Sequence, residues 1–312
     1  LQDCADKSEV DIEKIVPELF CESVKEMSDY AFLLEEEKQT LTLKQLISQS
    51  VYVVKNLVKN MQVTKFRPFM TEAYFGADRT RGDFRGMEID NGYRKLSFEG
   101  VIDRIDKYSD RVIIVDYKSK GSIEFGFSNV LYGDRIQLFI YLNALKNNMD
   151  ITSQGLFYLL MNNKFIKKDD KRFMFNGFVN CDENLLPDLD KGFGENEAFS
   201  SKVYPVQRKI DKDKNISYSA QKCGDILSSE QFDKMRDYVT KLTIKAAKEI
   251  EEGYIAKSPL NINGEEYVNA CKYCDYRSVC DREGRLVRSV KEVDKQEFME
   301  ITEGQDGANG MD

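Results

Sequence analysis

The stretch VIIVDYKSKG (Val112–Gly121) joins a run of aliphatic residues to an abrupt series of polar and charged ones. Its first four residues, Val112 to Val115, are all β-branched, which is typical of a strand covered on both faces. Asp116 and Lys118 then stand two residues apart, so an extended strand places both side chains on one face. Because a carboxylate and an ammonium are costly to desolvate at the end of a core strand, this pair is a candidate functional site.

The segment before this stretch predicts a partner strand. In YRKLSFEGVIDRIDKYSDR (residues 93–111), a YSD turn at positions 108–110 separates two strand-like runs, which predicts a hairpin. Asp103 stands 13 residues before Asp116 and falls on the neighbouring strand. Two carboxylates brought together repel each other unless a cation lies between them, so the hairpin predicts a cation site.

A divalent metal would give these acids a chemical role. Oxygen ligands at a site with few other donors suit Mg²⁺ or Mn²⁺. Such a metal would activate a water molecule and neutralise charge on a phosphoryl oxygen. Lys118 would stabilise the developing negative charge or help to position the water.

A plainer interpretation of the same pattern is a surface hairpin with a salt bridge between Asp116 and Lys118. Asp106, with Arg104 and Lys107 beside it, is a weaker candidate for the site, and we interpret it as a solvated strand end.

Composition limits the class of protein. The chain has 312 residues with a net charge of −8, and 41% of its residues are hydrophobic, so a sizeable core is possible. The negative balance argues against a strongly basic nucleic-acid module but not against a local basic channel. No apolar run approaches the ~20 residues of a membrane span, so we expect no membrane association. The polar N-terminus carries no signal peptide, and because it begins with Leu1 we expect a part of a longer protein.

The chain has seven cysteines and no histidine, which excludes catalysis by Ser-His-Asp or Cys-His groups of this chain. The uneven spacing is unlike a secreted disulfide framework and predicts a cytoplasmic protein. CKYCDYRSVC holds three of the cysteines at Cys-x2-Cys-x5-Cys spacing: Cys271, Cys274 and Cys280. Zinc bound by four cysteines and a [4Fe–4S] cluster both fit this count, and three free thiols are the plain alternative.

No Gly-x4-Gly-Lys-Ser/Thr motif is present, so these residues do not bind ATP through a P-loop.

The sequence pattern divides the chain into five regions. A helix is expected over residues 229–252, with Gly253 at its C-cap. We expect a helical part (1–68), a core (69–162), a polar insertion (163–228), a helix with the cysteine cluster (229–290) and a disordered tail (291–312).

GVIDRID, VDYKS and QLFIY (Gln137 to Tyr141) together resemble the core of the PD-(D/E)xK nucleases, and within them the RecB-type nuclease domains. The resemblance implies an α/β fold with a central mixed sheet flanked by helices. It also implies the roles of the site residues. Metal ligands would be Asp103, Asp116 and the backbone of Tyr117, Lys118 would be catalytic, and Gln137 and Tyr141 would lie on one helix face near DNA. The i, i+4 spacing of that last pair fits one face, although an ordinary helix face is the alternative.

Further segments resemble the B subunits of AddAB-type helicase–nucleases. They are FRPFMTEAYFG, VYPVQRKIDKDKNISYSAQKCG and KEIEEGYIAKSPL. This resemblance implies a Mg²⁺-dependent deoxyribonuclease that cuts a single DNA strand while a partner A subunit unwinds the duplex, during recombinational repair of double-strand breaks. Glu72 and Glu99 are possible further acids, and Glu99 shares the face of Asp103 by even spacing.

The same family implies a [4Fe–4S] cluster on the three clustered cysteines and one cysteine from before the core. The chain departs from the family because it lacks a Gly-x3-His element, and neither Cys4 nor Cys21 stands in a Cys-Pro context. Cys21 is the stand-in for a fourth ligand, but we expect that ligand to lie outside this chain and the cluster to be incomplete. Three rival hypotheses remain: a catalytically silent scaffold that grips DNA and docks the partner subunit, a Cas4-like exonuclease, and a zinc-stabilised binding module.

Overall fold

The computed structural model of the chain forms two compact units. Unit 1 comprises Leu1–Ala73, Val101–Ile123 and Ile151–Ser229, and unit 2 comprises Tyr74–Gly100, Glu124–Asp150 and Glu230–Asp312. No helix within the described ranges is long and apolar enough to span a bilayer. The structure describes residues 7–30, 32–35, 40–77, 82–90, 95–119, 125–161, 173–222, 224–262, 271, 274–280 and 287–308.

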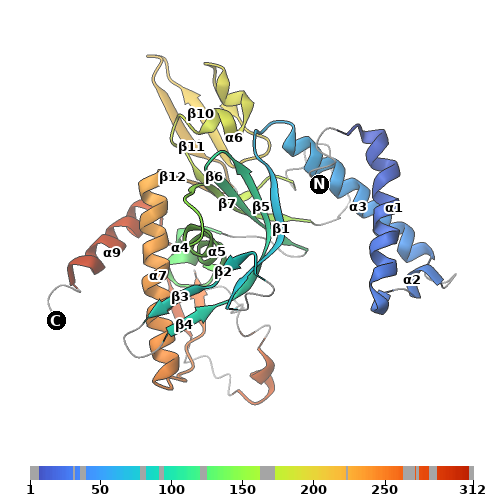
Figure 1. Ribbon diagram of the computed structural model, residues 1–312. Coiled ribbons are helices and arrows are strands. Elements are labelled where there is room, and N and C mark those ends of the chain that lie inside the picture. The colour runs from blue at the N-terminus through green and yellow to red at the C-terminus, as the bar shows by residue number, and fades with distance from the viewer. Residues whose placement is uncertain are drawn as a thin grey trace. The chain divides into compact units, whose positions relative to one another are not determined.

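Unit 1 is built on a mixed β-sheet (Figure 1), which confirms the expected α/β fold class. The strand order is β12-β8-β7-β6-β5-β1. The last residues of β1, Phe75 and Gly76, belong to unit 2 and pair there in parallel with β2. β6 is central and pairs antiparallel with β5 and parallel with β7. The bounds are β1 (Arg67–Gly76), β5 (Gly100–Tyr108), β6 (Arg111–Lys118), β7 (Thr152–Leu160), β8 (Asn176–Asn180) and β12 (Gly224–Leu227).

The expected hairpin is confirmed, and its strands are buried for the expected reason. Residues 111–116 of β6 are all buried, as the run of β-branched side chains predicts for a strand covered on both faces. β5 and β6 are joined through Ser109, whose φ of 57° lies in the left-handed region that a tight turn requires.

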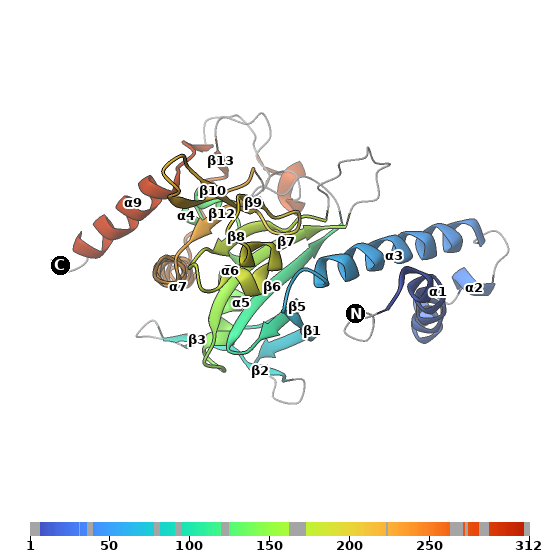
Figure 2. The same cartoon turned by 90° about the horizontal axis from the view of Figure 1, so that it is seen from above.

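Helices fill the first part of unit 1, as expected from the apolar spacing. They are α1 (Glu9–Glu26), the 3₁₀ turn η2 (Ser28–Tyr30), α2 (Phe32–Glu35) and α3 (Thr40–Met61). α1 starts with a capping box in which Ser8 and Asp11 satisfy each other's backbone N–H groups. α3 leads into β1 (Figure 2), and its Leu57 is buried in the core of the sheet. The Arg67 guanidinium donates to the carbonyls of Met61, Thr64 and Phe66, which secures the end of α3.

The region expected to be a polar insertion, 163–228, differs from that expectation. β8 and β12 lie within it, yet both belong to the central sheet, where they pair parallel with each other. The remaining elements carry buried apolar side chains such as Phe193 and Val206, so the region supplies part of the core. They are α6 (Leu186–Leu189), η4 (Lys191–Gly194), β9 (Phe199–Ser200), β10 (Val206–Ile210) and β11 (Ile216–Ala220).

Unit 2 contains the two long helices expected after the hairpin, α5 (Gln137–Lys146) and α7 (Ser229–Glu251), with Gly253 at a φ of +72° after the latter. The tail was expected to be disordered, but the structure shows helix α9 (Lys295–Ala308). Phe298 explains this difference, because it is fully buried against Phe127 and Tyr238. The other elements are β2 (Phe84–Arg85), β3 (Met87–Asp90), β4 (Lys95–Phe98), α4 (Phe127–Leu131), β13 (Leu260–Ile262), η5 (Asp275–Ser278) and β14 (Arg288–Val290).

An ion pair fixes the start of β6 to α6. The buried Arg111 guanidinium donates to Asp188, whose other oxygen lies 2.7 Å from the Lys65 ammonium. Burial alone would raise the pKa of Asp188, but hydrogen bonds from Lys65 and Arg111 outweigh it and hold the pKa below its ordinary value. The carboxylate therefore stabilises the folded state wherever it is ionised.

We expect Asp188→Asn to destabilise the fold by about 2–3 kcal/mol at neutral pH, because it leaves the Arg111 cation without its charge partner. The folded-state pKa is lowered, so this stabilisation is present above the unfolded value of about 4 and is lost as the pH falls through the folded value. Urea unfolding of both proteins at neutral pH and at about pH 3 measures this. A difference that persists undiminished in acid would contradict the assignment.

Candidate active site

The register of the β5–β6 hairpin places the two predicted acids opposite each other. The last paired residues are Arg104 and Val115, so one step further along the ladder lie Asp103 and Asp116. Arg104 and Val115 are directly opposed across an antiparallel pair, and cross-strand neighbours of this kind have side chains on the same face. The charge of Asp103 acts on Asp116, where it contributes to a raised pKa. The expected juxtaposition of acids is therefore present.

The backbone of Tyr117 holds Asp103 at the end of the ladder. Its N–H donates to Asp103 Oδ2 at 2.7 Å. Here the pairing of β5 with β6 has ended, so the carboxylate accepts a bond that a strand carbonyl would otherwise accept. Because the N–H and C=O of one strand residue point to the same side, the Tyr117 carbonyl also faces β5.

Asp116 is a buried acid under electrostatic strain. Asp116 is only 3% exposed to solvent. Burial raises the pKa of Asp116, and the charge of Asp103 adds to this, while the Lys118 ammonium opposes it. Lys118 Nζ lies 2.6 Å from Asp116 Oδ2, so the two side chains form an ion pair. The folded state therefore disfavours the ionised form of this carboxylate even with the ammonium beside it.

Lys118 shares the face of Asp116, as the two-residue spacing predicts. Its ammonium contacts Asp116 on one side and lies 5.1 Å from the centre of the Tyr158 ring on the other. Tyr158 is the β7 residue in register with Asp116, and it is buried. A cation over an aromatic face is attracted to it, so two contacts orient the ammonium.

The donor set of this face fits a small divalent cation. Mg²⁺ is usually bound by one or two carboxylates together with waters and substrate phosphates. Asp103 and Asp116 provide the two carboxylates. The raised pKa of Asp116 also fits a cation site, because a bound cation would favour the ionised form of this carboxyl group. Within the described part of the chain, no group of three or more Cys, Asp or Glu side chains is gathered for a metal.

Gln137 and Tyr141 lie on α5 of unit 2 and contact each other, because the Gln137 amide donates to the Tyr141 hydroxyl. Tyr141 is buried and meets Phe75 edge to face. The predicted i, i+4 geometry is thus observed. The further acids are exposed: Glu72 has a φ of 51°, and Glu99 accepts a hydrogen bond from Tyr74.

The cysteines of the predicted cluster stand around the short helix η5. Cys274 is exposed at its start, and Cys271 and Cys280 are half-buried. Their thiols do not form a ready metal site among the described residues. Cys21 lies on α1 of unit 1, and Cys4 and Cys223 lie outside the described residues.

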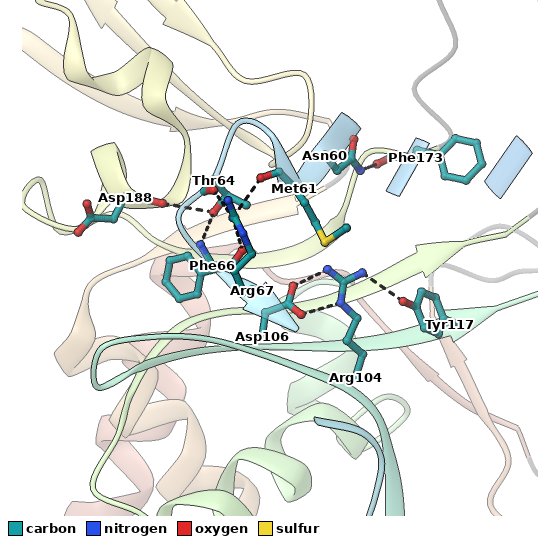
Figure 3. Close-up of polar contacts among 10 residues, drawn as sticks. All are labelled: Asn60, Met61, Thr64, Phe66, Arg67, Arg104, Asp106, Tyr117, Phe173 and Asp188. Carbon is teal, nitrogen blue, oxygen red and sulfur yellow. Dashed lines mark hydrogen bonds and ion pairs between the residues drawn. The ribbon is translucent and has the colours of Figure 1, made fainter. Parts of the chain in front are cut away.

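The structure corrects the interpretation of Asp106 as a solvated strand end. Asp106 and Arg104 are each 2% exposed and form a two-point ion pair at 2.6 Å and 2.6 Å (Figure 3). The guanidinium also donates to the Tyr117 hydroxyl at 3.2 Å. Burial alone would lower the pKa of Arg104, but Asp106 outweighs it and raises that pKa, so the cation is permanent. The i, i+2 spacing on a buried strand was the signal that could have revealed this pair.

Comparison with protein families agrees with this geometry. The family described as the PD-(D/E)XK nuclease superfamily matches residues 4–281. The chain belongs to the PD-(D/E)XK nuclease superfamily. This confirms the resemblance drawn from GVIDRID and VDYKS, and with it a family whose members generally use divalent metals.

Individual relatives are similar over most of this chain. Each is named as the B subunit of an ATP-dependent helicase/deoxyribonuclease. One from Alkaliphilus metalliredigens is 27% identical over 95% of the chain, one from Lachnoclostridium phytofermentans 27% over 90%, and one from Clostridium kluyveri 29% over 76%. The chain spans about a quarter of the length of these relatives, with 26%, 25% and 21% of each covered.

We expect Asp116→Asn to make the metal-free chain more stable at neutral pH, because a buried carboxylate is replaced by a neutral amide of similar shape. The pKa of Asp116 is raised on folding, so the wild type loses stability as the pH rises from about 4 through the folded value, and the variant does not. Thermal unfolding in a chelator across this range measures the difference. Equal pH dependence of both proteins would refute it.

Proposed function

We propose that this chain is the nuclease part of a helicase–nuclease B subunit and hydrolyses phosphodiester bonds of single-stranded DNA with Mg²⁺. The observation that carries the proposal is the buried Asp116, which lies beside Asp103 with the Lys118 ammonium 2.6 Å away. A buried acid whose surroundings disfavour its charged form destabilises the folded protein. Acids of this kind are found mostly at functional sites.

The residues of this face divide the chemistry between them. Asp103 and Asp116 would hold the metal, with the Tyr117 carbonyl as a further ligand. The bound metal would activate the attacking water and neutralise charge on the phosphoryl oxygen. Lys118 would stabilise the negative charge that develops on the phosphate as the water attacks, since its ammonium is already held on this face by Asp116 and Tyr158. Gln137 and Tyr141 would support the site or the strand.

The biological setting of the proposal comes from the relatives. Their name describes an ATP-dependent helicase and deoxyribonuclease, which implies a partner that couples ATP hydrolysis to unwinding. The substrate would be a single strand released from the duplex, and the setting would be recombinational repair of DNA breaks in the cytoplasm. The arrangement of Asp103, Asp116 and Lys118 is independent of that setting.

A salt bridge on a surface hairpin was the plain alternative for Asp116 and Lys118. The salt bridge exists, but β6 is a central strand and Asp116 is buried, so the hairpin is not a surface element. The catalytically silent scaffold remains the rival function, and it predicts that neither side chain matters for cleavage.

We expect Asp116→Ala and Lys118→Ala each to lower Mg²⁺-dependent cleavage of single-stranded DNA by at least about 100-fold, because each removes charge stabilisation at the reacting phosphate. The measurement is the cleavage rate of the chain, and of the complete complex, across Mg²⁺ concentrations. Asp188→Asn is the matched control, since it removes a half-buried, ion-paired charge from the same unit without touching this face. Unchanged cleavage by both alanine variants would establish the silent scaffold.

We propose separately that Cys271, Cys274 and Cys280 ligate a [4Fe–4S] cluster with a fourth ligand from outside this chain. The Cys-x2-Cys-x5-Cys spacing supports this, because a short loop can aim its thiolates at one metal centre. The described positions of these cysteines are not a ready site, so binding would reorganise the segment around η5. Such a cluster would join this segment to the part of the protein that supplies the fourth ligand, and it would act on stability rather than chemistry.

We expect the 312-residue chain reconstituted anaerobically with iron and sulfide to hold an incomplete or unstable cluster, because three thiolates leave one iron position without a protein ligand. Iron and sulfide analysis with visible absorption measures this, and Cys274→Ala should abolish the signal. A stable cluster with four irons per chain would contradict the missing ligand, and stoichiometric zinc would favour the binding module.

A further inference from the structure

We propose that Arg104, Asp106 and the Tyr117 side chain form a positioning strut for the metal site, on the opposite face of the hairpin from the acids. The inference rests on the proposed nuclease function and assigns these three residues a role in setting the geometry of Asp103 and Asp116. Their side chains lie on the face opposite Asp103 and Asp116.

Strand alternation puts the strut directly behind the acids. Asp103 faces one side of β5, so Arg104 and Asp106 frame the other side. Tyr117 stands between Asp116 and Lys118 on β6, and its side chain meets the Arg104 guanidinium at 3.2 Å. The backbone N–H of the same residue donates to Asp103 at 2.7 Å. Tyr117 thus ties the buried ion pair on one face to a metal-binding carboxylate on the other.

The contacts of Tyr117 with Arg104 and Asp103 matter because they lie where the β5–β6 ladder ends. Backbone pairing between β5 and β6 ends at Arg104 and Val115, so the ladder no longer sets the separation of the strands where the acids lie. Beyond that point, the described contacts from β5 to Tyr117 are the Arg104 bond to its hydroxyl and the Asp103 bond to its N–H. Figure 3 shows the Arg104 guanidinium held between Asp106 and Tyr117. The strut therefore replaces the missing backbone ladder at the site.

Stability alone is a weak explanation for this ion pair. Desolvating two charges is costly, and well-packed apolar residues of similar volume often stabilise a core as well or better. The surroundings would accept them, because Tyr117 packs against an apolar core that includes Ile113 and Val115. What apolar side chains cannot supply is the planar fork of the guanidinium, which fixes the direction of its hydrogen bonds to Asp106 and Tyr117.

The decisive experiment measures metal affinity rather than activity alone. We expect Tyr117→Phe, which removes only the hydroxyl, to weaken Mn²⁺ binding to the metal-free chain several-fold, and the apolar double variant Arg104→Met with Asp106→Leu to weaken it about tenfold. Mn²⁺ titration followed by electron paramagnetic resonance gives the affinity. The Mg²⁺ concentration for half-maximal cleavage should rise by the same factors, and saturating Mg²⁺ should restore most of the rate.

Hydrogen exchange at the Tyr117 amide supplies an independent readout. Both variants should exchange this amide faster than the wild type, because its bond to Asp103 loses the constraint behind it. Arg104→Lys should fail to rescue metal affinity, since an ammonium keeps the charge without the fork. Asp188→Asn is the control for lost stability, and it should leave the metal affinity unchanged.

The outcomes separate the inference from the proposed function. If Asp116→Ala leaves Mn²⁺ binding intact, the proposed function fails and the strut loses its purpose. If Asp116→Ala abolishes binding while Tyr117→Phe and the apolar double variant bind as the wild type does, the nuclease assignment stands and the strut is overturned. An equal loss of affinity in Asp188→Asn would also overturn it, because the effect would then follow stability.

Discussion

The bond from the Tyr117 N–H to Asp103 is the interaction on which the candidate site depends. It forms where the β5–β6 ladder stops, and it ties together two strands that would otherwise part beside two negative charges. Without a cation, Asp103 and Asp116 repel each other, so their repulsion destabilises this end of the hairpin in the metal-free protein. A bond to a charged acceptor is stronger than one between neutral groups, which suits this position.

The two faces of the hairpin carry different tasks for a physical reason. The face with Ile113 and Val115 is buried in the core of unit 1, so the polar groups on it must be paired, and Arg104 and Asp106 satisfy each other there. On the other face, the buried Asp116 carboxylate is paired with the partly exposed Lys118 ammonium at 2.6 Å and feels the charge of Asp103. The hairpin therefore carries a fully paired ion pair on one face and, on the other, an acid whose pKa is raised by burial.

The sequence was informative where structure is local. The β-branched run, the turn at 108–110 and the two-residue spacing of Asp116 and Lys118 each depend on neighbouring residues, and the hairpin and its shared face follow from them. The role of Asp106 depended on burial from distant segments, so its charge suggested a solvated position. The same limit applies to β8 and β12, whose place in the sheet is set by long-range pairing, and to α9, which Phe298 anchors.

A one-residue irregularity in β7 completes the environment of Asp116. Val112 pairs with Ser153 but Ile113 pairs with Gly155, so Gln154 is an extra residue in the ladder. A shift of one residue exchanges the two faces of a strand, so this bulge decides that Tyr158 rather than its neighbours lies in register with Asp116. The buried Gln154 amide donates to the Asn180 carbonyl, and the Asn180 amide donates to the Ser153 carbonyl.

This exchange of hydrogen bonds fixes the bulge to β8, the strand that sequence patterning assigned to an insertion. The orientation of the Lys118 ammonium over Tyr158 therefore depends on a pairing far from the acids in the chain. A motif of three charged residues can thus be identified from the sequence, whereas the register that makes the motif a site requires the whole sheet.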